Sequence, residues 1–260
     1  MNYSKNQQTI FEQMNSYPHD TVVPFKNEKE GKKKQVEHMF DQIAFRYDFL
    51  NRFLSGGIDI WWRKKAISQL KSLQPKTILD VATGTGDFAI ISNKILHPEK
   101  ITGIDISEGM LEIGRKKIIK AGLENKIELL QGDSEAILFP DNSFDAVTVA
   151  FGVRNFENLE KGLSEIRRVL KPGGKLVVLE FTRPHMPVVK QLYGCYMKYI
   201  TPTIGKIFAK NNDAYQYLND SVFQFPERKN FTNILNQSNY RNAFYKTLTL
   251  GICTIYCAEK

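Results

Sequence analysis

The chain has 260 residues, of which 42% are hydrophobic, and its formal net charge at pH 7 is +8. This length and hydrophobic content predict one main domain with a substantial core, and the positive charge permits contact with a membrane surface or with nucleic acid. There is no run of 18 apolar residues and no apolar N-terminal leader, so we expect a cytosolic protein that does not span a membrane. The three cysteines and four histidines lack metal-ligand spacing, which predicts no metal site.

Residues 1–34 are polar and lysine-rich, with prolines at positions 18 and 24. This composition predicts a flexible basic arm that precedes the folded domain at residues 35–260. Its lysines are expected to be solvated, and weak attraction to anionic lipid is the functional alternative.

Residues 35–73 predict two helices. Apolar side chains recur at helical spacing in the first helix, and Gly56 and Gly57 separate it from a second helix over residues 58–73. Such a pair is expected either to form a lid over a substrate pocket or simply to pack on the sheet. The apolar stripe comprises Val36, Met39, Phe40, Ile43, Tyr47, Leu50 and Leu54.

The stretch from Lys76 to Ala89 predicts a buried strand, a glycine turn and the start of a helix over residues 87–96. Gly84 and Gly86, with Thr85 between them, allow a sharp turn that approaches a ligand closely. The turn fits the dinucleotide pattern G-x-G-x-x-A, which alone is weak support for a nicotinamide cofactor. A purely structural turn is the third alternative.

Asp80, which lies just before the turn, favours S-adenosylmethionine over a nicotinamide. The methionine ammonium of that cofactor needs a carboxylate at the turn, and Asp80 is expected to serve it directly or through water. Asp105 closes a second strand, at residues 100–106, where a carboxylate accepts both ribose hydroxyls of an adenosine ligand. That feature suits either cofactor.

The next two strands end in further polar residues. A third strand over residues 126–130 leads to Asp133 and Ser134, which are expected to contact the adenine ring. A fourth strand over residues 144–151 includes Ala150 at the cofactor edge and runs into Arg154 and Asn155, which face the ligand crevice of a doubly wound sheet. A structural salt bridge is the alternative role for Arg154.

The rest of the chain continues the alternation. A helix is expected over residues 159–170 and a fifth strand over residues 175–181, so the cofactor-binding core spans residues 76–182. Residues 187–238 predict a helical substrate insertion whose apolar stripe is either core or the mouth of a site for a greasy substrate. Residues 239–260 predict a terminal antiparallel strand pair, which fits a seven-stranded methyltransferase sheet.

Several motifs in this order resemble the ubiquinone/menaquinone biosynthesis C-methyltransferase family. The first is YDFLN at residues 47–51, followed by WR at 62–63. The second is FGVRN at 151–155, and the third is RVLKPGG at 168–174, followed by EF at 180–181. The last is YQYL at 215–218, followed by SV at 221–222 and FP at 225–226. The resemblance covers about residues 36–260. The chain departs from the family pattern at Leu50, where Met is usual, at Asp59, where His is frequent, and at Thr83, where Gly is frequent, and a role for position 59 is therefore not expected.

The resemblance implies a Rossmann-like α/β fold of the class I S-adenosylmethionine-dependent methyltransferases, with a mostly parallel seven-stranded sheet and an N-terminal helical lid. It also implies methyl transfer to a ring carbon of a polyprenylated quinol, most simply demethylmenaquinol, with a methoxy-polyprenyl-benzoquinol of ubiquinone biosynthesis as the alternative. Arg154 and Asn155 would then stabilise the developing quinolate, and Tyr47 and Asp48 would close the lid or join that hydrogen-bond network.

The polyprenyl tail adds an expectation of peripheral contact with the inner face of the cell membrane. A homodimer would be in keeping with this kind of enzyme. A nucleic-acid methyltransferase is disfavoured because no N/D-P-P-Y/F motif is present, and a non-catalytic partner subunit because Asp80, Asp105 and Asp133 are all retained. An oxidoreductase is disfavoured because no Tyr-x-x-x-Lys pair is evident near the substrate edge.

Overall fold

We analysed a computed structural model of the chain, which describes residues 17–195 and 212–260. Residues 1–16 of the expected arm and residues 196–211 of the expected insertion lie outside the described part.

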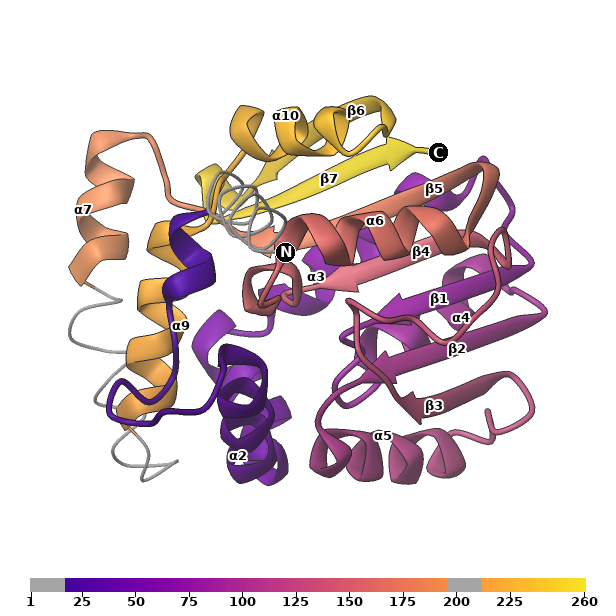
Figure 1. The fold of residues 1–260 in the computed structure, drawn as a ribbon, viewed down its shortest axis with the longest axis horizontal. Coiled ribbons are helices and arrows are strands. Elements are labelled where there is room, and N and C mark those ends of the chain that lie inside the picture. The colour runs from indigo at the N-terminus through magenta and orange to yellow at the C-terminus, as the bar shows by residue number, and fades with distance from the viewer. Residues whose placement is uncertain (1–16, 196–211) are drawn as a thin grey trace, which may run out of the picture.

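A seven-stranded sheet forms the centre of the molecule, with the strand order β3-β2-β1-β4-β5-β7-β6 (Figure 1). The first five strands run parallel, and β7 lies antiparallel to both β5 and β6. The expected fold and the terminal antiparallel pair are thus confirmed. The strands are β1 Thr77–Val81, β2 Lys100–Asp105, β3 Ile127–Gln131, β4 Phe144–Ala150, β5 Leu170–Phe181, β6 Arg241–Leu248 and β7 Cys253–Glu259.

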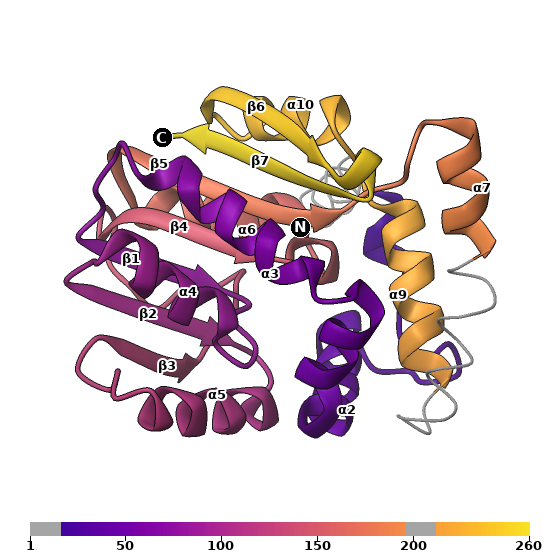
Figure 2. The same cartoon turned by 180° about the vertical axis from the view of Figure 1, so that it is seen from behind.

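Helices cover both faces of this sheet because the strands are apolar on both sides. On one face α6 (Leu159–Val169) and α10 (Lys229–Gln237) bury leucines and isoleucines against the strands, and on the other face α3 (Ile58–Ile67), α4 (Asp87–Leu96) and α5 (Glu108–Lys120) do the same (Figures 1 and 2). The two packed layers fix the carboxyl ends of the parallel strands at one edge, where ligands bind in such folds.

Three helices lie beyond that edge: α2 (Lys32–Ser55), α7 (Pro187–Cys195) and α9 (Asn212–Gln224) (Figure 1). Helix α2 ends at Gly56, whose φ of 58° is the left-handed conformation that glycine adopts easily. Val36, Met39 and Leu50 of α2 pack with Tyr217 of α9 in a third apolar cluster. Short 3₁₀ turns occur at Pro18–Thr21, Ser68–Leu70, Val153–Asn155 and Thr249–Gly251.

Residues 17–34 differ from the expected flexible arm. His19 and Lys32 are buried, and α2 begins at Lys32, three residues before the expected boundary. The Lys32 ammonium donates hydrogen bonds to the carbonyl oxygens of His19 at 2.7 Å and of Arg154 at 3.3 Å, which compensates its burial. The segment is therefore fastened to the domain beside the carboxyl edge of the sheet.

Gly162 of α6 provides a test of this packing. A Cβ atom there would lie 2.5 Å from Cδ2 of Phe156, a ring that is itself buried, so we expect Gly162→Ala to lower the free energy of unfolding by about 1–3 kcal/mol in a urea titration. Gly194→Ala in α7, where a Cβ would meet nothing within 4 Å, is the matched control and should cause no loss. Equal stability of the two variants would contradict the packing.

Candidate active site

The glycine turn between β1 and α4 is held in place by Asp105, at the end of β2. Gly84 and Gly86 have φ values of 55° and 76°, and the Gly84 amide donates to Oδ2 of Asp105 at 2.8 Å. The other oxygen, Oδ1, accepts a hydrogen bond from the amide of Ser107 at 2.9 Å. Burial raises the pKa of the Asp105 carboxyl to about 6. This carboxylate therefore fixes the turn and also faces the ligand edge.

Asp80 lies deeper than the sequence predicted. It is 1% exposed, and its two oxygens accept hydrogen bonds from the hydroxyls of Thr83 and Thr148, each at 2.6 Å. Burial raises its pKa to about 6. Asp80 is not among the residues that line the cavities at the sheet edge, so the structure gives it a supporting position beneath the glycine turn.

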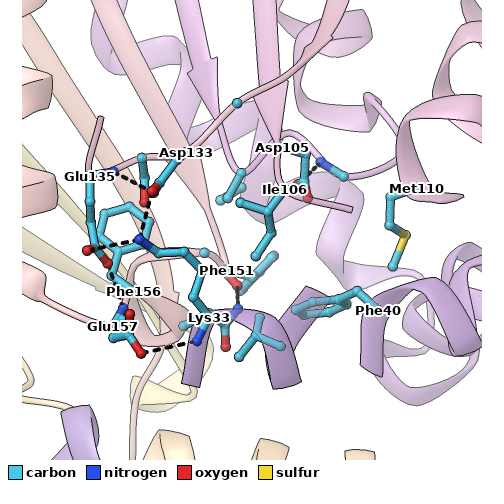
Figure 3. A pocket seen from close by; sticks show the side chains of 18 of the residues that line it. Lys33, Phe40, Asp105, Ile106, Met110, Asp133, Glu135, Phe151, Phe156 and Glu157 are labelled. Atoms are coloured by element: carbon cyan, nitrogen blue, oxygen red, sulfur yellow. Dashed lines mark hydrogen bonds and ion pairs between the residues drawn. The ribbon is translucent and has the colours of Figure 1, made fainter. Parts of the chain in front are cut away.

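A cavity of about 650 Å³ opens beside the turn (Figure 3). Five of the predicted cofactor residues line it: Gly84, Asp105, Asp133, Ser134 and Ala150. Phe40, Ile106, Met110 and Phe156 form its apolar walls, as Figure 3 shows. A Cβ atom at Gly84 would meet nothing within 4 Å, so the backbone of the turn faces open space. Carboxylates at the ends of β2 and β3 with an apolar slot between them suit an adenosine.

Lys33, which the sequence analysis placed in the solvated arm, enters this cavity from α2 (Figure 3). Its ammonium lies 2.7 Å from Oδ2 of Asp133 and 3.2 Å from Oε2 of Glu135. Glu135 is 4% exposed and also accepts hydrogen bonds from the amides of Glu157 and Asn158. The first residues of the lid helix α2 therefore line the part of the cavity that suits an adenosine.

A second cavity, of about 1000 Å³, lies between α2, α9 and the ends of β4 and β5. Its wall is mostly apolar, with charge contributed by Asp59, Arg63 and Arg154. Phe40, Tyr47 and Phe151 line both cavities, so the two spaces share one wall. The remaining lining residues are Met39, Ile43, Leu50, Asn51, Leu54, Ser55, Trp62, Phe181, Ala214, Tyr217 and Leu218.

Arg154 is 5% exposed and belongs to the wall of the second cavity. Its Nη1 donates to Oε1 of Glu180 at 2.8 Å and to the carbonyl of Phe151. Burial raises the pKa of Glu180, which is fully buried in β5. Among the described residues, the Nε of Arg154 has no hydrogen-bond acceptor. The salt bridge expected as the alternative role for Arg154 thus exists, and it leaves one donor of this guanidinium unused.

Asn155 lines the first cavity and is hydrogen-bonded to a residue that lines the second. Its Oδ1 accepts a hydrogen bond from the hydroxyl of Tyr217 on α9 at 3.2 Å. Arg154 and Asn155 follow Phe151, whose φ of 58° is uncommon for an aromatic residue. At this turn the chain leaves the direction of β4, so Arg154 and Asn155 lie at the carboxyl edge of the sheet.

Asp48, Thr85 and Gly86 lie outside both cavities. Oδ1 of Asp48 accepts a hydrogen bond from the Thr85 hydroxyl at 2.6 Å, and its Oδ2 lies 2.8 Å from the ammonium of Lys117 on α5. Asp48 therefore ties the lid helix to the glycine turn.

Several charged residues of the site were missed by the sequence analysis. Arg63 is 6% exposed, its Nε lies 3.6 Å from Oδ2 of Asp59, and its guanidinium stands over the Phe151 ring at 5.2 Å. Asp59 is also paired with Arg52, so this departure from the family pattern has a defined ion-pair role. The available signal for Arg63 was the WR pair at residues 62 and 63, one of the motifs that carry the family resemblance.

The profile of the ubiE/COQ5 methyltransferase family matches residues 27–260. This chain belongs to the ubiE/COQ5 methyltransferase family. The demethylmenaquinone methyltransferase of Bacteroides fragilis is 50% identical over 94% of this chain and 100% of its own length, and that of Porphyromonas gingivalis is 41% identical over 94% and 97%.

Solved structures agree on the fold of this ubiE/COQ5 family member. An S-adenosylmethionine-dependent methyltransferase of Thermotoga maritima superposes with a TM-score of 0.59 at 20% identity and covers 86% of this chain and 99% of its own. The phosphoethanolamine N-methyltransferase 2 of Haemonchus contortus gives a TM-score of 0.62 at 15% identity, over 86% and 59% of the two chains. The protein is a methyltransferase that uses S-adenosylmethionine, and the cavity beside the glycine turn has the residues to hold it.

The pKa of Asp105 predicts the pH dependence of cofactor affinity. If the ionised carboxylate accepts the ribose hydroxyls as predicted, affinity for S-adenosylhomocysteine should fall below pH 6, by up to about tenfold per pH unit, in calorimetric titrations. Asp105→Asn should bind more weakly at neutral pH and lose this slope. The control Asp141→Asn removes an exposed carboxylate and should keep the slope. A slope that persists in Asp105→Asn would assign the titration to another group.

Proposed function

We propose that this enzyme methylates a ring carbon of demethylmenaquinol, as the names of its Bacteroides and Porphyromonas relatives suggest for those proteins. The observation that carries the proposal is the second cavity. It is large and apolar, it shares a wall with the cofactor cavity, and it presents the buried guanidinium of Arg154. A polyprenylated quinol combines the two properties that such a cavity would recognise: a large apolar surface and an ionisable oxygen.

The chemistry requires an electron-rich ring. A quinol carbon is a weak nucleophile until a neighbouring hydroxyl loses its proton, in this proposal to water, and the bound cofactor would supply an electrophilic methyl group at its sulfonium. After the new carbon–carbon bond has formed, the methylated ring carbon would lose its own proton to water, which restores the aromatic ring. A guanidinium has no acceptor for a proton, so Arg154 is not the base in this proposal. Its role in the proposal is to orient the quinol oxygen, or a water on that oxygen, and to stabilise the negative charge that develops there.

The neighbouring residues hold this guanidinium and the ring in place. Glu180 and the Phe151 carbonyl fix one end of Arg154 in the wall of the second cavity, where the proposal places the quinol oxygen. Tyr217 donates a hydrogen bond to Asn155. Tyr47 lies in the wall between the two cavities, beside the space where the proposal places the quinol ring. Alignment of this kind supplies much of the rate enhancement in a transfer that needs no covalent enzyme intermediate.

The prenyl tail extends the proposal to the membrane. Within the described residues no helix is both long enough and apolar enough to cross a bilayer. Because the polyprenyl tail of the proposed substrate resides in the bilayer, we include peripheral contact with the membrane surface in the proposed function.

The substrate assignment is tested by a methyl-transfer assay. Purified protein receives labelled S-adenosylmethionine with a short-chain demethylmenaquinone or a short-chain methoxy-benzoquinone, each reduced or oxidised. We expect label in reduced demethylmenaquinone and none in the oxidised forms, because only the quinol forms a quinolate. Preferred labelling of the benzoquinol would move the enzyme to ubiquinone biosynthesis, and no labelling of either would refute a quinol substrate.

The role of Arg154 is tested by removing it together with its partner. The double variant Arg154→Met/Glu180→Gln leaves no unpaired buried charge, which avoids the instability that a single change would cause. We expect kcat to fall by about 10²- to 10⁴-fold while the Kd for S-adenosylhomocysteine changes little. The control Arg154→Lys keeps a cation opposite Glu180 and should lose less activity. Equal losses of turnover and cofactor affinity would make Arg154 a structural residue.

A further inference from the structure

The wall of the second cavity contains a buried cation that the proposed mechanism does not use, Arg63 of α3. It is 6% exposed and lines the same cavity as Arg154. Among the described residues its one ion pair is the 3.6 Å contact between its Nε and Oδ2 of Asp59, which is too long for a hydrogen bond, and this Nε has no acceptor. A guanidinium held in a cavity wall with so few partners in the protein suits a ligand that brings an acceptor to it.

Asp59, the acidic neighbour of Arg63, is already paired without it. Oδ1 of Asp59 accepts a hydrogen bond from the Ser55 hydroxyl at 2.9 Å, and Oδ2 accepts one from Nη1 of Arg52. Both carboxylate oxygens would therefore keep a partner if the Arg63 side chain were shortened. The presence of Arg63 in the cavity wall is thus not explained by a need to neutralise Asp59.

The two guanidinium groups of the cavity come from different elements and stand over neighbouring rings. Arg63 of α3 stands over the Phe151 ring at 5.2 Å, and Arg154 of the turn after β4 stands over the Phe181 ring at 5.7 Å. Both cations also act on Tyr47: burial raises the pKa of its hydroxyl, and the charges of Arg63 and Arg154 act in the opposite direction. Two separate cations therefore lie near the wall that this cavity shares with the cofactor cavity.

We propose that Arg63 binds the second oxygen of the quinol ring, the one para to the oxygen at Arg154, through the terminal nitrogens of its guanidinium. The inference rests on the proposed function, because it concerns the same ring in the same cavity. The second oxygen keeps its proton and accepts a hydrogen bond, since a guanidinium has donors only. A ring held at both ends is fixed in its own plane, which presents the carbon beside the first oxygen to the methyl group.

The charges around the cavity favour two hydroxyl oxygens over a single carboxylate as the ligand of these cations. Arg154 is already paired with Glu180, and Asp59 places a negative charge 3.6 Å from Arg63. A carboxylate ligand would bring a further negative charge toward both acidic groups in a mostly apolar space. A hydroxyl accepts a hydrogen bond without adding charge, so a quinol fits this arrangement better.

A substrate that lacks one oxygen tests the contact. Short-chain demethylmenaquinol is compared with the corresponding 3-prenyl-1-naphthol, which keeps the oxygen beside the reacting carbon and lacks the para oxygen. For each compound we would measure kcat/KM of methyl transfer and the Kd for enzyme saturated with S-adenosylhomocysteine. The preference for the quinol over the naphthol should be about tenfold smaller in Arg63→Met than in the wild-type enzyme, because a hydrogen bond to a charged group is then lost with the quinol alone. The intrinsic difference in reactivity between the two rings is common to both enzymes and cancels.

Two further variants separate a lost contact from a disturbed fold. Arg63→Lys keeps a cation and should retain part of the preference, and Lys64→Met removes an exposed cation from the same helix and should keep all of it. Arg63→Met should bind S-adenosylhomocysteine as the wild-type enzyme does, because Asp59 keeps its other partners.

The outcomes distinguish this inference from the proposed function on which it rests. An unchanged preference in Arg63→Met would overturn the contact and leave the quinol substrate in place. Equal losses of affinity for the quinol and the naphthol would make Arg63 a structural residue and would also overturn the contact. If the wild-type enzyme methylates neither compound, the proposed function is refuted, and the ratio of the Kd values still decides whether Arg63 recognises the para oxygen.

Discussion

The attachment of the lid to the glycine turn is the constraint on which the site depends. Arg52 of α2 pairs with Asp59 of α3 and with Asp87 at the start of α4, and Lys117 of α5 pairs with Asp48 and Asp87. These half-buried ion pairs join four helices around the first turn of α4. Because the same helix α2 forms a wall of both cavities, the pairs fix the substrate wall relative to the cofactor turn.

The buried charges of the substrate cavity show a different use of electrostatics. Arg154 and Glu180 are both nearly inaccessible, and a buried pair of this kind contributes little net stability because each ion loses its water. Its retention in the wall is understandable if the guanidinium is kept in place for a substrate oxygen. The rings of Phe151 and Phe181 stack with a centroid distance of 4.4 Å, and each of them lies beneath a guanidinium, that of Arg63 or that of Arg154.

The sequence predicted the parallel core well because each element there has a strong local signal. Helix α4 occupies residues 87–96 as expected, and Ser107 caps α5 by accepting a hydrogen bond from the Met110 amide. The carboxylate at the end of β2 was predicted by the same logic, since parallel strands bring their carboxyl ends to one edge.

Tertiary contacts decided what the sequence did not predict. Lysines in a polar segment are usually solvated, yet Lys32 is buried by carbonyl groups that come from residues 19 and 154. The sequence did not predict that two threonine hydroxyls, one of them 68 residues away, hold Asp80 beneath the turn. The ion pair between Glu180 and Arg154 was not predicted, because it forms only when the fold places Arg154 beside β5.

The wall shared by the two cavities has a thermodynamic consequence. Phe40, Tyr47 and Phe151 touch both spaces, so a ligand that shifts these side chains in one cavity alters the shape of the other. Binding free energies coupled in this way are reciprocal: the factor by which cofactor changes the affinity for quinol equals the factor by which quinol changes the affinity for cofactor. The demethylated cofactor product, which fills the same cavity, would alter quinol affinity through these three side chains too.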